Sequence, residues 1–343
     1  MTYPLAGLLI HKVKQAGFHR PEASHEFYLA SGEAAGLSKA EFALRKDLWA
    51  RCVYAYQSVS IAKGHLPDRT IDALRNYHTR LQDQSLDLRL RCQDIVVQCC
   101  IAVSDNGTQG TISDDRANAI SVLVRVFDSR LQDLEAEILT RLILPSQQGL
   151  ANIPTLGITE NLHIQLARLN IQVFSLFIRP PACSHSTEEP IPLLYSTAVK
   201  VLDLVKRLIQ TQSFPPSPHN SIVDALLMAS FTILRIAKTY KNDARMEDAG
   251  NHIRSSKHLA ISLSSNEHDS LSKMAIMLQD LWTHPQAYRN ANGSLDVPIP
   301  FLGRLSAGLV IDAASKWFES VKSLPEHGMA IPSEHSSRGR YSL

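Results

Sequence analysis

One stretch, Ser38 to Pro67, constrains the fold of this 343-residue chain more than any other. Ser38 and Glu41 stand three residues apart, the spacing at which a hydroxyl and a carboxylate each accept a hydrogen bond from a free amide at a helix start. Gly64 suits the left-handed conformation that closes a helix, and Pro67 prevents its continuation. At ~1.5 Å per residue the helix would be close to ~40 Å long. We therefore expect the rest of the chain to pack around it.

The faces of this helix follow from the spacing of its apolar residues. Phe42, Trp49, Tyr56 and Lys63 fall on one heptad row. The neighbouring row consists of Leu48, Cys52, Ala55, Val59 and Ala62. Together the two rows have the width of a stripe that faces a core. We therefore predict that Trp49 is a buried anchor of the fold.

Apolar residues three and four positions apart predict further helices along the whole chain. The expected ranges are 4–16, 23–30, 70–81, 86–103, a long helix that starts at 113–115, 162–178, 193–209, 222–241, 248–262, 271–282 and 302–321. The range 222–241 is apolar nearly all round, so it is expected to lie centrally. No stretch alternates with period two. The predicted fold is all-α, a single large irregular domain of roughly ten helices over 1–323, with a disordered polar tail over 324–343.

Composition restricts the class of protein. A hydrophobic content of 44% with 20% charged residues supports a packed core, and a net charge of +2 is too small to indicate a nucleic-acid surface. The most apolar run, 222–237, is interrupted by Asp224 and Arg235 and is too short to span a bilayer. The start of the chain lacks the basic lead-in of a secretory signal, and five scattered cysteines fit a reducing compartment. We expect an intracellular protein with no membrane partner.

Several segments, in the same order, resemble the regulatory domain of a known family. The motifs are Gly7–Ile10 with Gly17–Glu22, Leu48–Cys52 with Tyr56–Ser60 and Lys63–Pro67, Leu166–Phe177, Ala229–Leu234, and Leu278–Trp282 with Arg304–Ala307 and Trp317. They are similar to the regulatory (middle homology) domain of fungal zinc-cluster transcription factors, closest to the class named after the leucine-biosynthesis regulator. The tryptophans Trp49, Trp282 and Trp317 make the set more specific than its apolar helices alone.

The resemblance implies an all-helical domain that regulates transcription in the nucleus, in some members in response to a small metabolite. Its expected partners are the transcription machinery or a homologous chain. Relatives carry an N-terminal six-cysteine zinc cluster that reads DNA, which this sequence lacks, since Met1 falls inside the regulatory domain. We therefore expect an N-terminally truncated member without cofactor, which would reach DNA only through a missing N-terminal module.

No motif in the sequence indicates catalysis or metal binding. H-E-x-x-H and G-x-S-x-G are absent, and Cys92 and Cys99, six residues apart, lack the C-x-x-C units of a zinc cluster. Their position on a predicted inward face favours buried, unreactive thiols. We expect no enzyme activity. The alternatives left open are a helical protein-interaction scaffold and a helical enzyme without a recognisable motif.

Polar residues inside apolar helices are the only candidates for a binding site. In one helix these are His163, Gln165, Arg168, Asn170 and Gln172. Arg168 and Gln172 share a face at i and i+4, and a guanidinium suits a small carboxylate metabolite. Arg235 in the central helix is a candidate on the same ground. Hydrogen bonds within the domain are the simpler interpretation of all three residues.

Overall fold

The computed structural model describes residues 3–20, 38–69, 83–106, 113–143, 156–178, 190–211, 220–240, 243–290, 292–295, 298–300 and 304–322. Within these ranges the chain forms ten α-helices and two 3-10 helices, and its only β-type pairing is an isolated bridge between Arg289 and Leu295. The predicted all-α fold is confirmed. The predicted helices at 23–30 and 70–81 and the tail lie outside the described residues.

The helices are α1 (Tyr3–Gln15), α3 (Lys39–Ala62), α4 (Gln84–Asp105), α5 (Asp114–Ile143), α6 (Ile158–Gln172), η3 (Val173–Phe177), α7 (Pro190–Thr211), α8 (Asn220–Thr239), α9 (Asp243–Leu263), α10 (Ser270–Thr283), η4 (Leu305–Ala307) and α11 (Gly308–Lys322). None of these helices is long and apolar enough to cross a membrane.

Both predicted ends of α3 are confirmed. The amide of Glu41 donates to Ser38 Oγ at 3.2 Å, and the amide of Ser38 donates to Glu41 Oε2 at 2.9 Å, which completes the capping box. Gly64 adopts a left-handed φ of 71°. A Cβ at Gly64 would lie 2.3 Å from the carbonyl oxygen of Arg304, so glycine is needed here both for its conformation and for the close approach of the chain.

The inward face of α3 was only partly predicted. Trp49 and Tyr56 are buried as expected. Leu48, however, is 41% exposed, and Ala62 is exposed, so the second predicted row is wrong at these positions. The buried face instead includes Val53 and Ser60. The reason is the position of α1 and α4, which flank α3 on sides that the spacing of α3 alone does not specify.

Two predicted helices change type along their length. The helix expected over 162–178 is α-helical only to Gln172 and continues as η3, and the helix expected over 302–321 begins with η4. All residues of η3 are buried, and the amide of Ile299 donates to the carbonyl of Leu176 at 2.9 Å. A Cβ at Gly308 would lie 3.0 Å from the Phe177 ring. The tighter turn of η3 therefore coincides with close packing against the segment that leads into α11.

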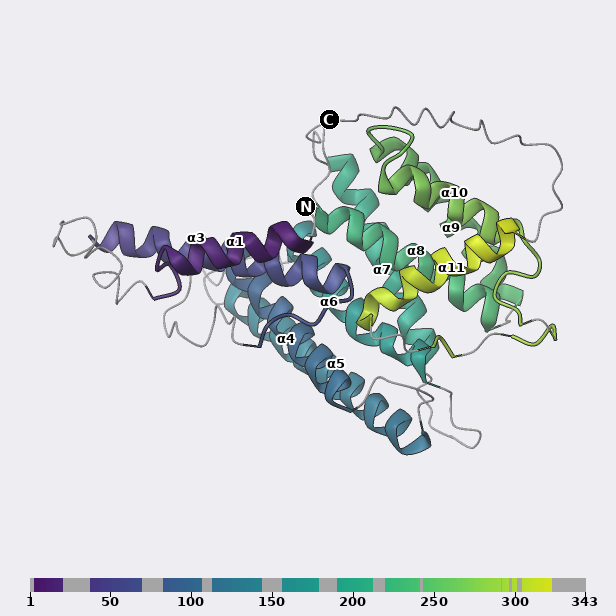
Figure 1. The fold of residues 1–343 in the computed structure, drawn as a ribbon, viewed down its shortest axis with the longest axis horizontal. Coiled ribbons are helices and arrows are strands. Elements are labelled where there is room, and N and C mark those ends of the chain that lie inside the picture. Colours follow the sequence, from purple (N-terminus) through teal and green to yellow (C-terminus); the bar gives the residue numbers. More distant parts are fainter. Residues whose placement is uncertain are drawn as a thin grey trace, which may run out of the picture.

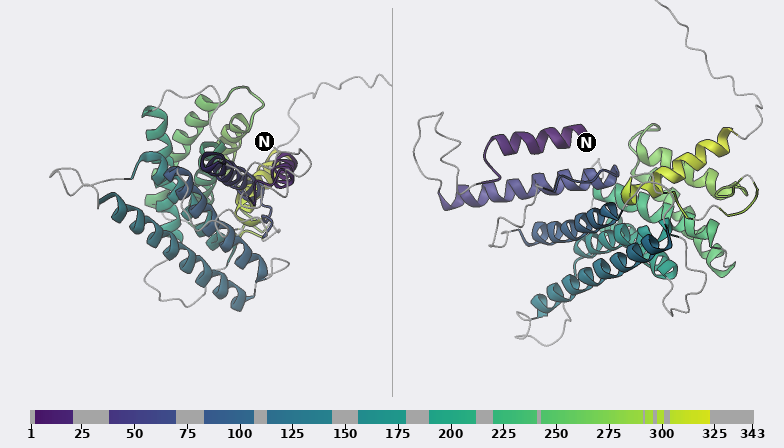
Figure 2. Two further views of the ribbon diagram at one scale, coloured as in Figure 1. Left: turned by 90° about the vertical axis from the view of Figure 1, so that its left-hand side faces the viewer. Right: turned by 60° about the horizontal axis from the view of Figure 1, so that its bottom comes forward.

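Two hydrophobic clusters hold these helices together. The larger extends over α4 to α11, and α8 lies within it as predicted, with most of its side chains buried. The smaller joins α1, α3 and the start of α4 through Ala6, Ile10, Trp49, Ala50, Cys52, Val53, Tyr56, Leu86 and Leu90. Figure 1 shows α1 beside α3 at one end of the molecule, away from α9 to α11. Figure 2 shows α1 as the outermost layer over α3.

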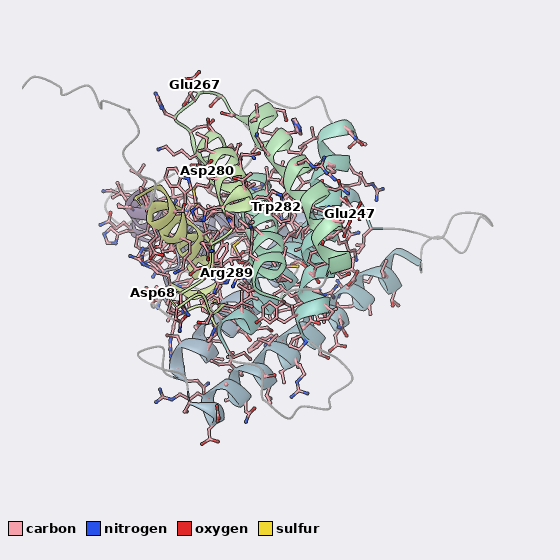
Figure 3. The ribbon with its side chains drawn as sticks, turned by 90° about the vertical axis from the view of Figure 1, so that its right-hand side faces the viewer. Asp68, Glu247, Glu267, Asp280, Trp282 and Arg289 are labelled. Carbon is pink, nitrogen blue, oxygen red and sulfur yellow. The ribbon has the colours of Figure 1, made fainter. Side chains whose placement is uncertain are left out.

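The opposite end is closed by α9, α10 and α11, where Asp280 and Trp282 of α10 are labelled in Figure 3. Trp282 lies so close to α9 that a Cβ on Gly250 would be 3.2 Å from its ring. Trp317 of α11 donates from Nε1 to Asp280 Oδ2 at 2.8 Å. All three tryptophans of the chain therefore sit where helices pack against each other.

Candidate functional site

Arg168 and Gln172, the first candidate pair, meet at the same carboxylate of α5. Arg168 Nε donates to Asp128 Oδ1 at 3.1 Å, and Gln172 Nε2 donates to the same oxygen at 3.2 Å. Arg168 also donates to Glu135 Oε2 at 3.1 Å and to Gln165 Oε1 at 3.3 Å. Arg168 and Gln172 therefore lie on one face of α6, as their spacing predicts. Their polar groups bind acidic residues of the domain itself.

The charges around Arg168 oppose the binding of a third carboxylate. The side chains of Arg168 and Asp128 are 12% and 10% exposed, and that of Glu135 is 24% exposed. One guanidinium faces two carboxylates, so the cluster carries an excess negative charge. A carboxylate ligand would have to displace Asp128 or Glu135 from a largely buried ion pair. The geometry favours hydrogen bonding within the domain.

Two buried amides in this cluster keep one unpaired atom each. Gln165 Nε2 and Gln172 Oε1 are buried and have no hydrogen-bond partner. Their orientations are fixed, because turning either amide would set donor against donor at Arg168 or acceptor against acceptor at Asp128. An unpaired buried polar atom costs about 1–3 kcal/mol. At the interface of α5 with α6 the charged groups are therefore paired, while the two amides are only partly satisfied.

Arg235 lies in a different and deeper ion pair. Its Nη1 donates to Asp312 Oδ2 of α11 at 3.0 Å, and the two side chains are only 2% and 6% exposed. The guanidinium stacks 4.6 Å from the centre of the Tyr288 ring. Tyr288 has a φ of 64°, and burial raises the pKa of its hydroxyl. Arg235 thus connects α8, α11 and the segment after α10, and the structure does not bring it together with Arg168.

A shallow groove of about 330 Å³ runs between α4 and α5. Its lining residues are Arg91, Asp94, Ile95, Arg130, Asp133, Leu134 and Glu137. Arg91 and Arg141 both pair with Glu137, while Arg130 donates to Gln98 Oε1 at 2.7 Å and lies 5.2 Å from the Phe127 ring centre. Both guanidinium groups of the groove are therefore already engaged by the protein.

A fourth polar constellation lies where α3, α4, α6 and α8 approach one another. It comprises Tyr54, Arg89, His163 and Asp224, one from each helix. The Tyr54 and His163 rings meet edge to face with centroids 6.4 Å apart. Burial, with a contribution from the charge of Arg89, lowers the pKa of His163 to about 4. Burial raises the pKa of Asp224 to about 6, against an opposing effect of Lys63.

Two members of this constellation have unused hydrogen-bonding groups. Nε of Arg89 is buried and has no acceptor. His163 is 8% exposed and makes no hydrogen bond with any described residue. Tyr54, by contrast, hydrogen-bonds Ser58, which donates to Gln93 at 3.4 Å. The constellation therefore contains a guanidinium, that of Arg89, and an imidazole, that of His163, whose hydrogen-bonding groups are not used by the described residues.

Sequence reasoning identified only part of this constellation. His163 stood out as a polar residue in an apolar helix, but Tyr54, Arg89 and Asp224 were not selected. Their separation along the chain hides the group, since each lies on a different helix. The available signal was the position of Arg89 between the buried Leu88 and Leu90, and that of Asp224 within the most apolar run.

The cysteines agree with the predicted buried, unreactive thiols. Cys52, Cys92, Cys99 and Cys100 are free and buried. Burial raises the pKa of Cys92 and of Cys99 to about 12, so both remain protonated at neutral pH. In the described part of the chain no three histidine, cysteine, aspartate or glutamate side chains come together as potential metal ligands.

The chain matches no protein-family model, no curated protein and no solved structure at a significant level.

Proposed function

We propose that this chain is the regulatory domain of a transcription factor of the fungal zinc-cluster type and that it acts in the nucleus without reading DNA by itself. The observation that carries the proposal is the placement of the resembling segments. They fall in order on α1, α3, α6 with η3, α8, α10 and the η4–α11 segment. Their tryptophans lie at helix contacts, as core anchors of a shared fold would.

The response to an effector is part of this proposal. Arg168, Gln172 and Arg235 were the initial candidates for a small carboxylate. Because Arg168 and Gln172 share Asp128 and Arg235 pairs with Asp312, each already has an acidic partner in the domain. The proposal therefore does not place the effector at these residues.

The test is a reporter assay in fungal cells. The full chain is fused to an unrelated DNA-binding domain whose site controls a reporter gene. We expect reporter transcription to differ several-fold from that given by the DNA-binding domain alone, in either direction. A fusion that accumulates to the same level and leaves transcription unchanged would contradict the proposal.

A matched pair of variants separates a folded regulatory domain from a nonspecific effect. Trp49→Ala removes a buried anchor and should abolish the change in reporter transcription, whereas Leu44→Ala alters a 68% exposed side chain on the same helix and should preserve it. Equal activity of both fusions would indicate that the effect does not depend on the fold.

A protein-interaction scaffold is the second candidate, and one observation favours it. Leu5 and Leu8 of α1 are 54% and 53% exposed and lie about one helical turn apart, as do Leu44 and Leu48 of α3. Pairs of exposed leucines of this kind are found at sites of protein association. Loss of partner binding on Leu5→Ser/Leu8→Ser, with reporter activity retained, would favour the scaffold.

A further inference from the structure

The junction of α3, α4 and α6 contains a guanidinium that the domain leaves unneutralised. Arg89 is partly buried, its Nε has no acceptor, and it forms no ion pair with any residue that the structure describes. The other arginines of the interior behave differently, since Arg168 pairs with Asp128 and Glu135, and Arg235 pairs with Asp312. A buried guanidinium nitrogen without an acceptor carries an energetic cost that an anionic ligand relieves.

The side chains around Arg89 supply further hydrogen-bonding groups of the right kind. His163 is more than nine-tenths buried, has no hydrogen-bond partner among the described residues, and is close enough for the charge of Arg89 to lower its pKa. As a neutral imidazole it offers one N–H donor. The Tyr54 ring packs edge to face against the His163 ring and so flanks the imidazole. A planar oxyanion suits this pair of groups chemically, because it has one oxygen to accept from the guanidinium and another to accept from the imidazole N–H.

We propose that Arg89 and His163, flanked by Tyr54, form a binding site for the carboxylate group of a small monoanionic molecule. The charge at the site determines the class of ligand. One guanidinium with a neutral imidazole gives a single positive charge, which a carboxylate neutralises and a phosphate dianion exceeds. The inference concerns binding by the chain and does not depend on a role in transcription.

The experiment is a nuclear magnetic resonance titration of the full chain labelled with ¹⁵N-histidine. His163→Gln identifies the His163 ring signals by their loss. Sodium acetate is added at constant ionic strength, with sodium phosphate and sodium chloride in parallel. We expect a saturable shift of the His163 signals with acetate alone, and a rise in the pKa of His163 by about one unit, since a neighbouring anion favours the imidazolium.

Variants assign the effect to Arg89. Arg89→Gln should weaken acetate binding at least tenfold, while Arg254→Gln, which alters an arginine of α9 bonded only within its own helix, should leave it unchanged. If circular dichroism shows that Arg89→Gln does not fold, Arg89→Lys replaces it and should weaken binding several-fold, because lysine keeps the charge but not the planar fork.

Three results would overturn the proposal. The first is a shift with acetate that does not saturate or that sodium chloride reproduces. The second is equal acetate affinity in the folded Arg89 variant and in the unaltered chain. The third is binding of phosphate in place of acetate, which would contradict the assignment to a carboxylate.

Discussion

The outer layer of α1 and the interior around α8 bury their side chains to different extents. At one end α1 buries only Ala6 and Ile10 fully and leaves Leu5 and Leu8 more than half exposed. In the interior, α8 buries Ala225, Leu226, Ala229, Phe231, Ile233 and Leu234 to within 1% exposure. In the smaller cluster α1 therefore packs against α3 on one side, whereas α8 is surrounded by α6, α7, α9, α10 and α11.

The difference in burial between the two clusters also shows in the position of the buried charged groups. The interior around α8 is extensive enough to bury a complete ion pair, that of Arg235 with Asp312. The layer of α1 and α3 depends on one tryptophan and on the capping box at Ser38. Between them lies the junction with Arg89 and His163, where burial is deep and pairing is incomplete. The comparison indicates that the buried ion pairs lie in the larger cluster, whereas Arg89, where the two clusters meet, has a buried Nε without an acceptor.

The largest effect is expected from breaking the interior ion pair. Asp312→Ala leaves the buried guanidinium of Arg235 without its carboxylate and should lower the free energy of unfolding by about 3–5 kcal/mol, measured by chemical denaturation. Arg235→Met/Asp312→Leu removes both charges and should recover most of that loss. A single-variant loss below about 1 kcal/mol would mean that the pair does not stabilise the interior.

Trp49→Ala tests the smaller cluster. Removing a side chain that is 2% exposed should lower the free energy of unfolding by about 3 kcal/mol, because the thin layer of α1 and α3 can close part of the resulting cavity. Leu44→Ala on the same helix should change it by less than about 0.5 kcal/mol. If both variants unfold at the same denaturant concentration, Trp49 is not the anchor of this cluster.

His163 gives the junction a pH dependence of defined sign. Its pKa is about 4 in the folded chain and 6.5 ordinarily, so the unfolded chain takes up the proton first as the pH falls. The stability that it contributes is complete at pH 7 and is lost as the pH falls toward 4, by about 2 kcal/mol between pH 7 and pH 5. His163→Gln lacks this loss, so its deficit against the unaltered chain should narrow by that amount at pH 5.

The other charged groups of the junction define the control for that measurement. Asp224 acts in the opposite direction, since its folded pKa is raised to about 6 and the stability it contributes is lost as the pH rises. Because Asp224 is present in both proteins, its effect cancels in the difference. A deficit that is the same at pH 7 and pH 5 would show that folding does not lower the pKa of His163.

The smallest effect is expected at the start of α3. Ser38→Ala removes one half of the capping box and should cost about 1 kcal/mol in chemical denaturation. Lys39→Ala, one residue further on and exposed, does not alter the cap and serves as the matched control. Equal stability of the two variants would show that the cap contributes nothing measurable.

Local interactions were predictable from the sequence, and contacts between distant helices were not. The capping box and the closing conformation of Gly64 depend on residues a few positions apart, and both were predicted correctly. The exposure of Leu48 depends on where α1 and α4 lie, which no pattern within α3 specifies. For the same reason the change from α-helix to η3 was missed, since the packing of Phe177 against Gly308 involves residues far apart in the chain.

The candidate sites follow the same division. The shared face of Arg168 and Gln172 was predicted from their spacing, yet their common partner Asp128 comes from another helix. The pairing of Arg235 with Asp312 spans 77 positions. Arg89, His163 and Tyr54 each look ordinary on their own helix. Only the fold brings them together, so sequence reasoning reached His163 and not its neighbours.

The central claim is that an enclosed core around α8 supports a separate, less stable layer of α1 and α3. Native-state hydrogen exchange, followed residue by residue at increasing low denaturant concentrations, tests it directly. We predict that amides in the middle of α8 exchange only through global unfolding, with its full denaturant dependence. Amides of α1 should exchange through an opening of lower free energy and smaller denaturant dependence. Equal exchange free energies for α1 and α8 would contradict the claim.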